Sequence, residues 1–121
     1  MAKHNILGER GEDIAVDYLQ QKGYLILFRN WRYKHYEIDI IATDKGTLVI
    51  VEVKTRSTSA FGEPEFFVDL KKQNRLIEAT EAFIEQTNYY GETRFDVVAI
   101  TLNKGSEPTV NHIIDAFIPL G

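Results

Sequence analysis

The chain contains no cysteine among its 121 residues. This absence excludes disulfides, thiolate zinc sites and cysteine nucleophiles together. No stretch approaches the roughly 18 apolar residues that a membrane-spanning helix needs, and the first residues lack the apolar region of a signal peptide. From the sequence we therefore expect a cytoplasmic protein that does not have a membrane as its partner.

Several signatures of nucleotide-binding and hydrolytic sites are also missing. The chain has no G-x-G-x-x-G, no G-x-x-x-x-G-K and no G-x-S-x-G motif. Its histidines, His4, His35 and His112, are not spaced as metal ligands are. A serine triad would need a histidine and an orienting acid, and nothing in the sequence indicates them. The remaining chemistry rests on carboxylates and basic side chains.

Length and composition predict a single domain over residues 1–121. A hydrophobic share of 44% and a charged share of 26% are typical of a soluble globular protein. The net charge of −4 by itself argues against a nucleic-acid partner, because phosphate binding rests on lysine and arginine. The basic residues are nevertheless grouped, and each group either binds phosphates or forms a solvated face. The grouped residues are Arg29, Arg32, Lys34, Lys54, Arg56, Lys71, Lys72 and Arg75.

Apolar periodicity predicts two helices and five strands. The helices are expected over residues 5–22, ended by Gly23, and over 69–87, capped by Asp69. Strands are expected at 24–33, at two places in a hairpin over 36–56, at 94–102 and at 110–117, with a loop over 57–65. This order predicts an α/β fold, in which a mixed sheet is flanked by two helices and the second helix forms a right-handed crossover.

The first helix carries two unusual features. Gly11 points into its apolar stripe and Gly8 lies at the edge of that stripe. A glycine in a helix costs about 1 kcal/mol relative to alanine, so we expect the close approach of a neighbouring element. Glu12 lies on the flank of the stripe, where it either turns inward or stays solvated near the positive end of the helix dipole.

The hairpin over residues 36–56 brings charged residues together. If its turn is of even length and centred on Lys45 and Gly46, Asp39 lies opposite Glu52 and Glu37 lies opposite Lys54. A turn of odd length would separate these pairs. The other face of the hairpin is expected to be entirely apolar, and it comprises Ile38, Ile40, Ala42, Val49, Val51 and Val53.

Two carboxylates that face each other across a sheet repel. Such a pair is tolerated if it is solvated, shares a proton or holds a cation. Hard divalent cations take carboxylate oxygens, and a lysine two residues from Glu52 suits chemistry on a phosphate. The alternative is that Glu37 and Lys54 form a simple ion pair while Asp39 and Glu52 point into solvent.

The pattern Asp39, twelve residues, then Glu52-Val53-Lys54 resembles the PD-(D/E)xK nuclease superfamily, and the αβββαβ order is that of its restriction-endonuclease-like fold. More narrowly, the chain resembles the YraN-like family of small bacterial proteins, which are similar to Holliday junction resolvases. It departs from that family's pattern at Tyr36, where glycine is usual, and no proline precedes Asp39. The stretches that support the resemblance are Gly8–Ala15, Gly23–Tyr24, Asn30–Arg32, Glu37–Ala42, Val51–Arg56 and Arg94–Val98.

The resemblance implies a Mg²⁺-dependent endonuclease, with Mn²⁺ as a substitute, that acts on structured or branched DNA. Asp39, Glu52 and the Val53 carbonyl would hold the metal, Glu12 would lie near it, and Lys54 would position the attacking water. A homodimer follows from the analogy with resolvases alone. The alternative is a catalytically idle module on the same fold that binds nucleic acid or another partner. Candidate nucleic-acid contacts are Arg32, Arg56, Lys71, Lys72 and Arg75.

Overall fold

The computed structural model describes residues 6–57 and 68–118, which form two helices and five strands in the predicted order αβββαββ. The predicted loop over 57–65 lies outside these residues, apart from Ser57, which belongs to β3. The α/β class and the restriction-endonuclease-like order are confirmed. The elements are α1 (Ile6–Gln21), β1 (Leu25–Tyr33), β2 (Tyr36–Asp44), β3 (Thr47–Ser57), α2 (Leu70–Thr87), β4 (Thr93–Leu102) and β5 (Thr109–Ile113).

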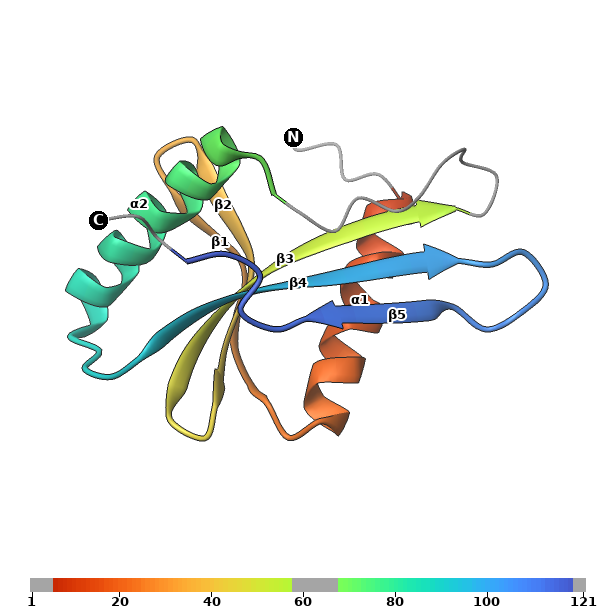
Figure 1. Cartoon of the computed structure of the whole chain (residues 1–121), viewed down its shortest axis with the longest axis horizontal. Helices are drawn as coiled ribbons and strands as arrows, with labels where there is room; N and C mark the ends of the chain where they lie inside the picture. Colours follow the sequence, from red (N-terminus) through yellow and green to blue (C-terminus); the bar gives the residue numbers. More distant parts are fainter. Residues whose placement is uncertain (1–5, 58–67, 119–121) are drawn as a thin grey trace.

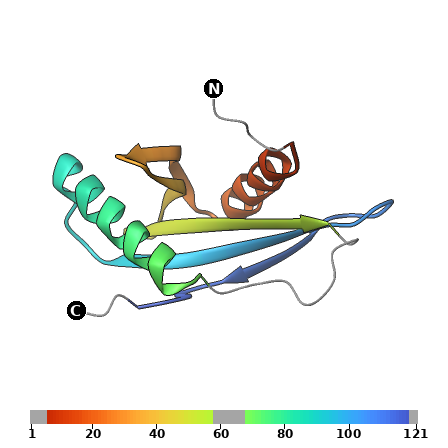
Figure 2. The ribbon, with the colours of Figure 1, turned by 90° about the horizontal axis from the view of Figure 1, so that it is seen from above.

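The five strands form one mixed sheet in the order β1-β2-β3-β4-β5. Only β3 and β4 run parallel, and α2 lies between them in the chain as the crossover. Helix α1 packs on β3 and β4, whereas α2 packs on β1 and β2 at the other end of the sheet (Figures 1 and 2). Within the described residues, neither helix is long and apolar enough to cross a membrane.

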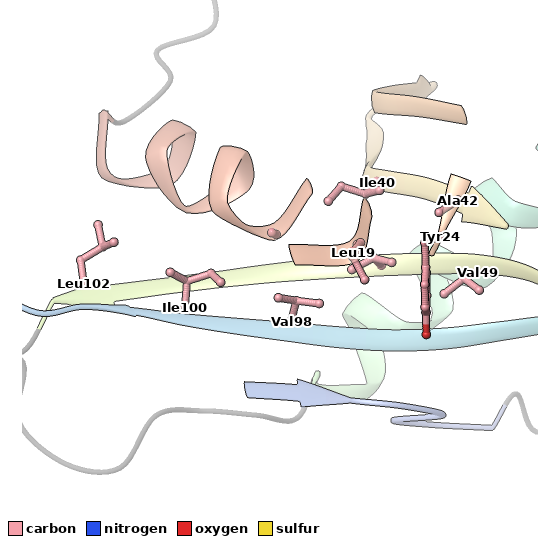
Figure 3. Packing of buried hydrophobic residues seen from close by; sticks show 10 residues of the cluster. Leu19, Tyr24, Ile40, Ala42, Val49, Val98, Ile100 and Leu102 are labelled. Carbon is pink, nitrogen blue, oxygen red and sulfur yellow. The ribbon is translucent and has the colours of Figure 1, made fainter. Parts of the chain in front are cut away.

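Each helix covers its own apolar cluster. Leu19 of α1 packs with Val49 of β3 and Val98 of β4 in the first cluster (Figure 3). Leu76 and Phe83 of α2 pack in the second cluster, with residues of β2, β3 and β4. Because strand side chains alternate between faces, the odd-numbered residues of β3 face α1 and the even-numbered ones face α2.

The prediction of one continuous apolar face on the hairpin is wrong at Ile38. Ile40 and Ala42 lie in the cluster under α1, but Ile38 lies in the cluster under α2 together with Trp31. The paired strands β1 and β2 twist away from the rest of the sheet as an arm, which turns this end of β2 toward α2 (Figure 1).

Two expectations for the remaining elements also need correction. The last strand spans Thr109–Ile113 rather than 110–117, because Asp115 adopts a left-handed φ of 58° and turns the chain. After this turn, the Ala116 N–H donates to the carbonyl of Phe95 at 2.7 Å. The apolar periodicity of residues 69–87 predicts that Leu70 packs on the sheet, but this residue is 64% exposed because it begins α2 at the edge of the cluster.

The expected close approach to the first helix occurs at Gly11. A Cβ at this buried position would overlap Thr55 Oγ1 and lie 2.7 Å from Thr55 Cγ2, so α1 contacts β3 directly there. A Cβ on Gly8 would have no heavy atom within 4 Å. The close approach therefore explains Gly11 but not Gly8.

A buried polar network ties β4 and β5 to the start of β1. The fully buried carboxylate of Asp96 accepts from Arg94 Nε at 2.9 Å and Nη2 at 3.0 Å, and from the N–H of Asp115 at 3.0 Å. His112 Nε2 lies 2.8 Å from its Oδ2. Arg94 Nη2 also donates to the Tyr24 hydroxyl at 2.6 Å, and Nη1 lies 3.4 Å from Asp44 Oδ2. Both carboxylate oxygens of Asp96 are thus satisfied.

Burial by itself would raise the pKa of Asp96, but the hydrogen bonds from His112 and Arg94 and from the Asp115 N–H outweigh it and lower this pKa. A carboxyl whose pKa is lower in the folded state than in the unfolded state binds fewer protons when folded. Its contribution to the free energy of unfolding is therefore present above the unfolded pKa, about 3.9, and is lost as the pH falls through the folded pKa.

We predict that Gly11→Ala destabilises the protein by about 1–3 kcal/mol, although alanine favours helices, because the new methyl group overlaps Thr55. Gly8→Ala is the matched control, and it should leave stability unchanged or raise it by up to about 1 kcal/mol. Urea unfolding followed by circular dichroism measures both changes. Equal effects of the two substitutions would contradict the close approach of α1 to β3.

We predict that Asp96→Asn lowers the free energy of unfolding at pH 7 by about 3 kcal/mol, because it removes the buried charge that Arg94 and His112 contact and leaves Arg94 only its longer contact with Asp44. The loss should shrink as the pH falls below about 4, because the Asp96 carboxyl of the unfolded wild type takes up a proton there while that of the folded state, with its lowered pKa, stays ionised to lower pH. Asp44→Asn, which alters a longer contact with the same guanidinium, is the control and should cost less. Urea unfolding at pH 7 and pH 3 checks the order of the two variants.

Candidate active site

The candidate site lies where β2 leaves β3. The two strands pair from Asp44 and Thr47 at the turn to Ile40 and Val51, in the register that the even-length turn predicts. Beyond that pair, β2 continues into the arm with β1 while β3 stays beside β4 (Figure 1). The strands therefore form a fork.

Asp39 lies at the mouth of this fork, directly after the last pair of β2 with β3. Its side-chain Oδ2 accepts a hydrogen bond from the backbone N–H of Val53 at 2.8 Å. In a continued ladder, a backbone carbonyl of β2 would accept this hydrogen bond instead. In a strand, the N–H and the C=O of one residue point toward the same neighbouring strand. The Val53 carbonyl is therefore also directed into the fork, beside the carboxylate of Asp39.

Glu52 is buried at the same place, with 6% of its surface exposed. Its Oε2 lies 3.2 Å from the ammonium of Lys72 on α2. Its Oε1 is buried and, while Asp39 is ionised, has no hydrogen-bond partner among the described residues. Because nearly all buried polar atoms in proteins are paired, this oxygen marks a position where a cation would fit.

The two carboxyl groups influence each other. Burial raises the pKa of Asp39 well above its usual value, and the negative charge of Glu52 raises it further. A hydrogen bond from the protonated Asp39 to Glu52 and the charge of Glu12 act in the same direction, whereas the Val53 N–H acts against them. Without a cation, the pair is therefore best accommodated when it holds a proton.

Lys54 lies two residues beyond Glu52, on the same face of β3. It is half-buried and forms no ion pair with any residue that the structure describes. The predicted pairing of Glu37 with Lys54 is wrong, because the ladder ends before Glu37, which instead lies opposite Arg32 on β1. Their side chains form an ion pair at 3.2 Å between Arg32 Nη2 and Glu37 Oε2.

Glu12 turns inward, as one of its two expected placements required, and 15% of its side chain is exposed. It lies near enough to raise the pKa of Asp39, but its Oε1 is 3.5 Å from Arg29 Nη2 on β1. Over residues 6–57 and 68–118, no three acidic or histidine side chains gather in a way that could hold a metal ion. Glu12 therefore lies beside the Asp39–Glu52 pair without completing a set of three carboxylates.

A pocket of about 160 Å³ opens next to Asp39. Lys72 and Arg75 of α2 line it together with Tyr36, and the guanidinium carbon of Arg75 lies 5.9 Å from the centre of the Tyr36 ring. Lys71 and Arg75 line a second hollow beside it. The predicted basic residues of α2 are thus brought to the edge of the carboxylate pair.

The two remaining basic residues lie on separate strands. Arg32 is 61% exposed at its side chain despite its ion pair with Glu37. Arg56 is half-buried on the same face of β3 as Lys54. Both flank the fork, Arg32 from the arm and Arg56 from the end of β3.

The sequence did not indicate two contacts of the site. The sequence predicts Lys72 as a candidate nucleic-acid contact, and its pairing with Glu52 depends on how α2 docks on the sheet. Arg29 belonged to a basic group with no assigned partner, yet it forms ion pairs with Glu12 and Asp13. Neither contact has a local signal in the sequence.

We predict that Asp39→Asn raises the melting temperature by a few degrees at pH 7 in metal-free buffer. The raised pKa means that the folded state binds more protons than the unfolded state, so the free energy of unfolding falls as the pH rises above about 4. Asparagine removes this penalty and can still accept from Val53. Asp13→Asn, at an exposed site on α1, is the control, and a lower melting temperature for Asp39→Asn would contradict the prediction.

The comparisons with known proteins identify relatives along almost the whole chain. The model of the uncharacterised protein family UPF0102 matches residues 11–100. A UPF0102 protein of Bacteroides thetaiotaomicron is 45% identical over 98% of this chain and 98% of its own. One of Christiangramia forsetii is 47% identical over 97% and 98%, and one of Rhodococcus opacus is 42% identical over 97% and 100%. The chain therefore belongs to the uncharacterised protein family UPF0102, the YraN-like group that its motifs indicated.

Proposed function

We propose that this protein is a Mg²⁺-dependent endonuclease that hydrolyses phosphodiester bonds in structured or branched DNA. The observation that carries the proposal is the buried Glu52 Oε1, which has no partner and lies beside the half-buried carboxyl group of Asp39 at the mouth of the fork. An unpaired buried carboxylate oxygen is costly, and it is retained most readily where a ligand satisfies it.

The donor set fits a hard divalent cation. Asp39, Glu52 and the Val53 carbonyl would supply oxygen ligands, which Mg²⁺ and Mn²⁺ prefer. When bound, the ion would neutralise charge on the phosphodiester oxygens and lower the pKa of a water molecule. Because the described residues add no third carboxylate to this set, positions remain for water and for a phosphate oxygen, as Mg²⁺ sites in phosphate-processing enzymes usually require.

The chain's own residues would orient the substrate. Lys54, without an ion-pair partner among the described residues, is available to hold the attacking water and to offset charge that develops on the phosphate. Lys71 and Arg75 at the pocket edge would bind flanking phosphates, with Arg32 and Arg56 on either side of the fork. The preference for branched DNA rests on the resemblance to junction resolvases.

A second candidate function is a module that binds nucleic acid or another partner without catalysis. It is favoured by the absence, within the described residues, of three acidic or histidine side chains that could hold a metal ion together. Titration with Mg²⁺ and Mn²⁺, followed by calorimetry and by NMR signals of Asp39 and Glu52, separates the two functions. The module would show no binding at millimolar metal.

We predict that Asp39→Ala and Lys54→Ala each lower metal-dependent cleavage about a hundredfold or more, because the first removes a ligand of the metal and the second removes a cation beside the reacting phosphate. The measurement is cleavage of labelled branched, nicked, single-stranded and duplex substrates with Mg²⁺ and with Mn²⁺. Lys104→Ala, in the exposed turn before β5, is the matched control and should cleave as the wild type does.

Circular dichroism must show that the variants are folded, so that a loss of activity reports on the site. Unchanged cleavage in both Asp39→Ala and Lys54→Ala would rule out this site as the reaction centre.

A further inference from the structure

Lys72 is the only cation that the structure pairs with Glu52 among the described residues. We propose that Lys72 is an exchangeable counter-ion, which holds Glu52 while the site is empty of metal and must leave when a divalent cation binds. This inference rests on the proposed metal site and names a residue that regulates it.

The geometry lets Lys72 occupy the site without belonging to the core. Its backbone N–H donates to the capping carboxylate of Asp69 at 2.8 Å, which fixes the first turn of α2 over the fork. From there the side chain extends until Nζ is 3.2 Å from Glu52 Oε2. The Lys72 side chain is 43% exposed, whereas that of Glu52 is 8% exposed, so the lysine can swing into solvent and the glutamate cannot.

The electrostatics explain why the exchange would take place. One ammonium group reaches one oxygen of Glu52 and leaves Oε1 unpaired. Asp39 also remains next to the negative charge of Glu52, which contributes to its raised pKa. A divalent ion between the two carboxylates would satisfy both at once, but it would repel an ammonium only a few ångströms away.

The ion pair of Lys72 with Glu52 stabilises the folded protein when no metal is bound. Without Lys72, Glu52 would be a buried carboxylate with no charged partner, which is strongly destabilising. A lysine suits an exchangeable role better than an arginine would, because its ammonium is a strongly hydrated point charge on a flexible stem. When released, the ammonium can move into the pocket that Lys72 lines with Arg75, where a substrate phosphate would lie.

The test is the affinity for Mn²⁺, measured by isothermal titration calorimetry on the wild type and on Lys72→Met, which keeps the length of the side chain and removes its charge. We expect Lys72→Met to bind Mn²⁺ roughly three- to tenfold more tightly, because the screened pairing with Glu52 no longer competes. Its melting temperature should fall in metal-free buffer and rise more than that of the wild type when Mn²⁺ is added. Lys72→Arg should restore competition and bind Mn²⁺ nearly as the wild type does.

Lys104→Met, in the exposed turn before β5, is the matched control and should leave the Mn²⁺ affinity unchanged. If the wild type binds Mn²⁺ and Lys72→Met binds it equally or more weakly, the counter-ion role is overturned while the metal site stands. If neither the wild type nor any variant binds Mn²⁺ and Asp39→Ala changes nothing, the metal site itself is overturned and the counter-ion role with it.

Discussion

The end of pairing between β2 and β3 is the constraint on which the candidate site depends. Past Ile40 and Val51, the twist of the β1–β2 arm carries β2 toward α2. The backbone of β3 at Val53 then lacks a strand partner on that side, and the carboxylate of Asp39 takes its place. The same departure leaves room beside Glu52 for the first turn of α2 and the side chain of Lys72.

The sheet contains two buried carboxylates whose surroundings differ in an informative way. Asp96 accepts hydrogen bonds at both oxygens, and these bonds lower its pKa despite burial. Glu52 has one charged contact and one unpaired oxygen, and its neighbour Asp39 has a raised pKa. A fully satisfied buried network fixes a structure, whereas a partly satisfied pair costs stability and calls for another explanation. This contrast supports a structural role for Asp96 and a binding role for the fork.

The parts of the site that could be predicted from the sequence are those set by short-range rules. The Lys45–Gly46 turn sets the register as far as Ile40 and Val51, one pair short of Asp39 and Glu52, whose side chains still lie together. The helical period places Gly11 against a neighbour. The ion pair of Glu37 with Arg32 lies across the two-residue turn of the β1–β2 hairpin, a short-range signal that the assignment of Glu37 to Lys54 overlooked. Arg94 and Asp96 share a strand face, so their pairing had a local signal that a residue-by-residue interpretation of Asp96 missed. His112, which contacts Asp96, lies 16 residues away in the sequence, and only the pairing of β4 with β5 brings the two together.

The net charge of −4 is compatible with a phosphate partner because α2 separates its charges along its length. Lys71, Lys72 and Arg75 lie in its first half, next to the fork and to the positive end of the helix dipole. Glu81 and Glu85 in its second half line a different hollow with Tyr33. Glu78, in the middle of the helix, lines both this hollow and the one that Lys71 and Arg75 line. A polyanion would be repelled from that second half and attracted to the first, so the acidic residues help to direct a phosphate backbone toward the fork. The distribution of charge along one helix therefore matters more for binding than the total charge of the chain.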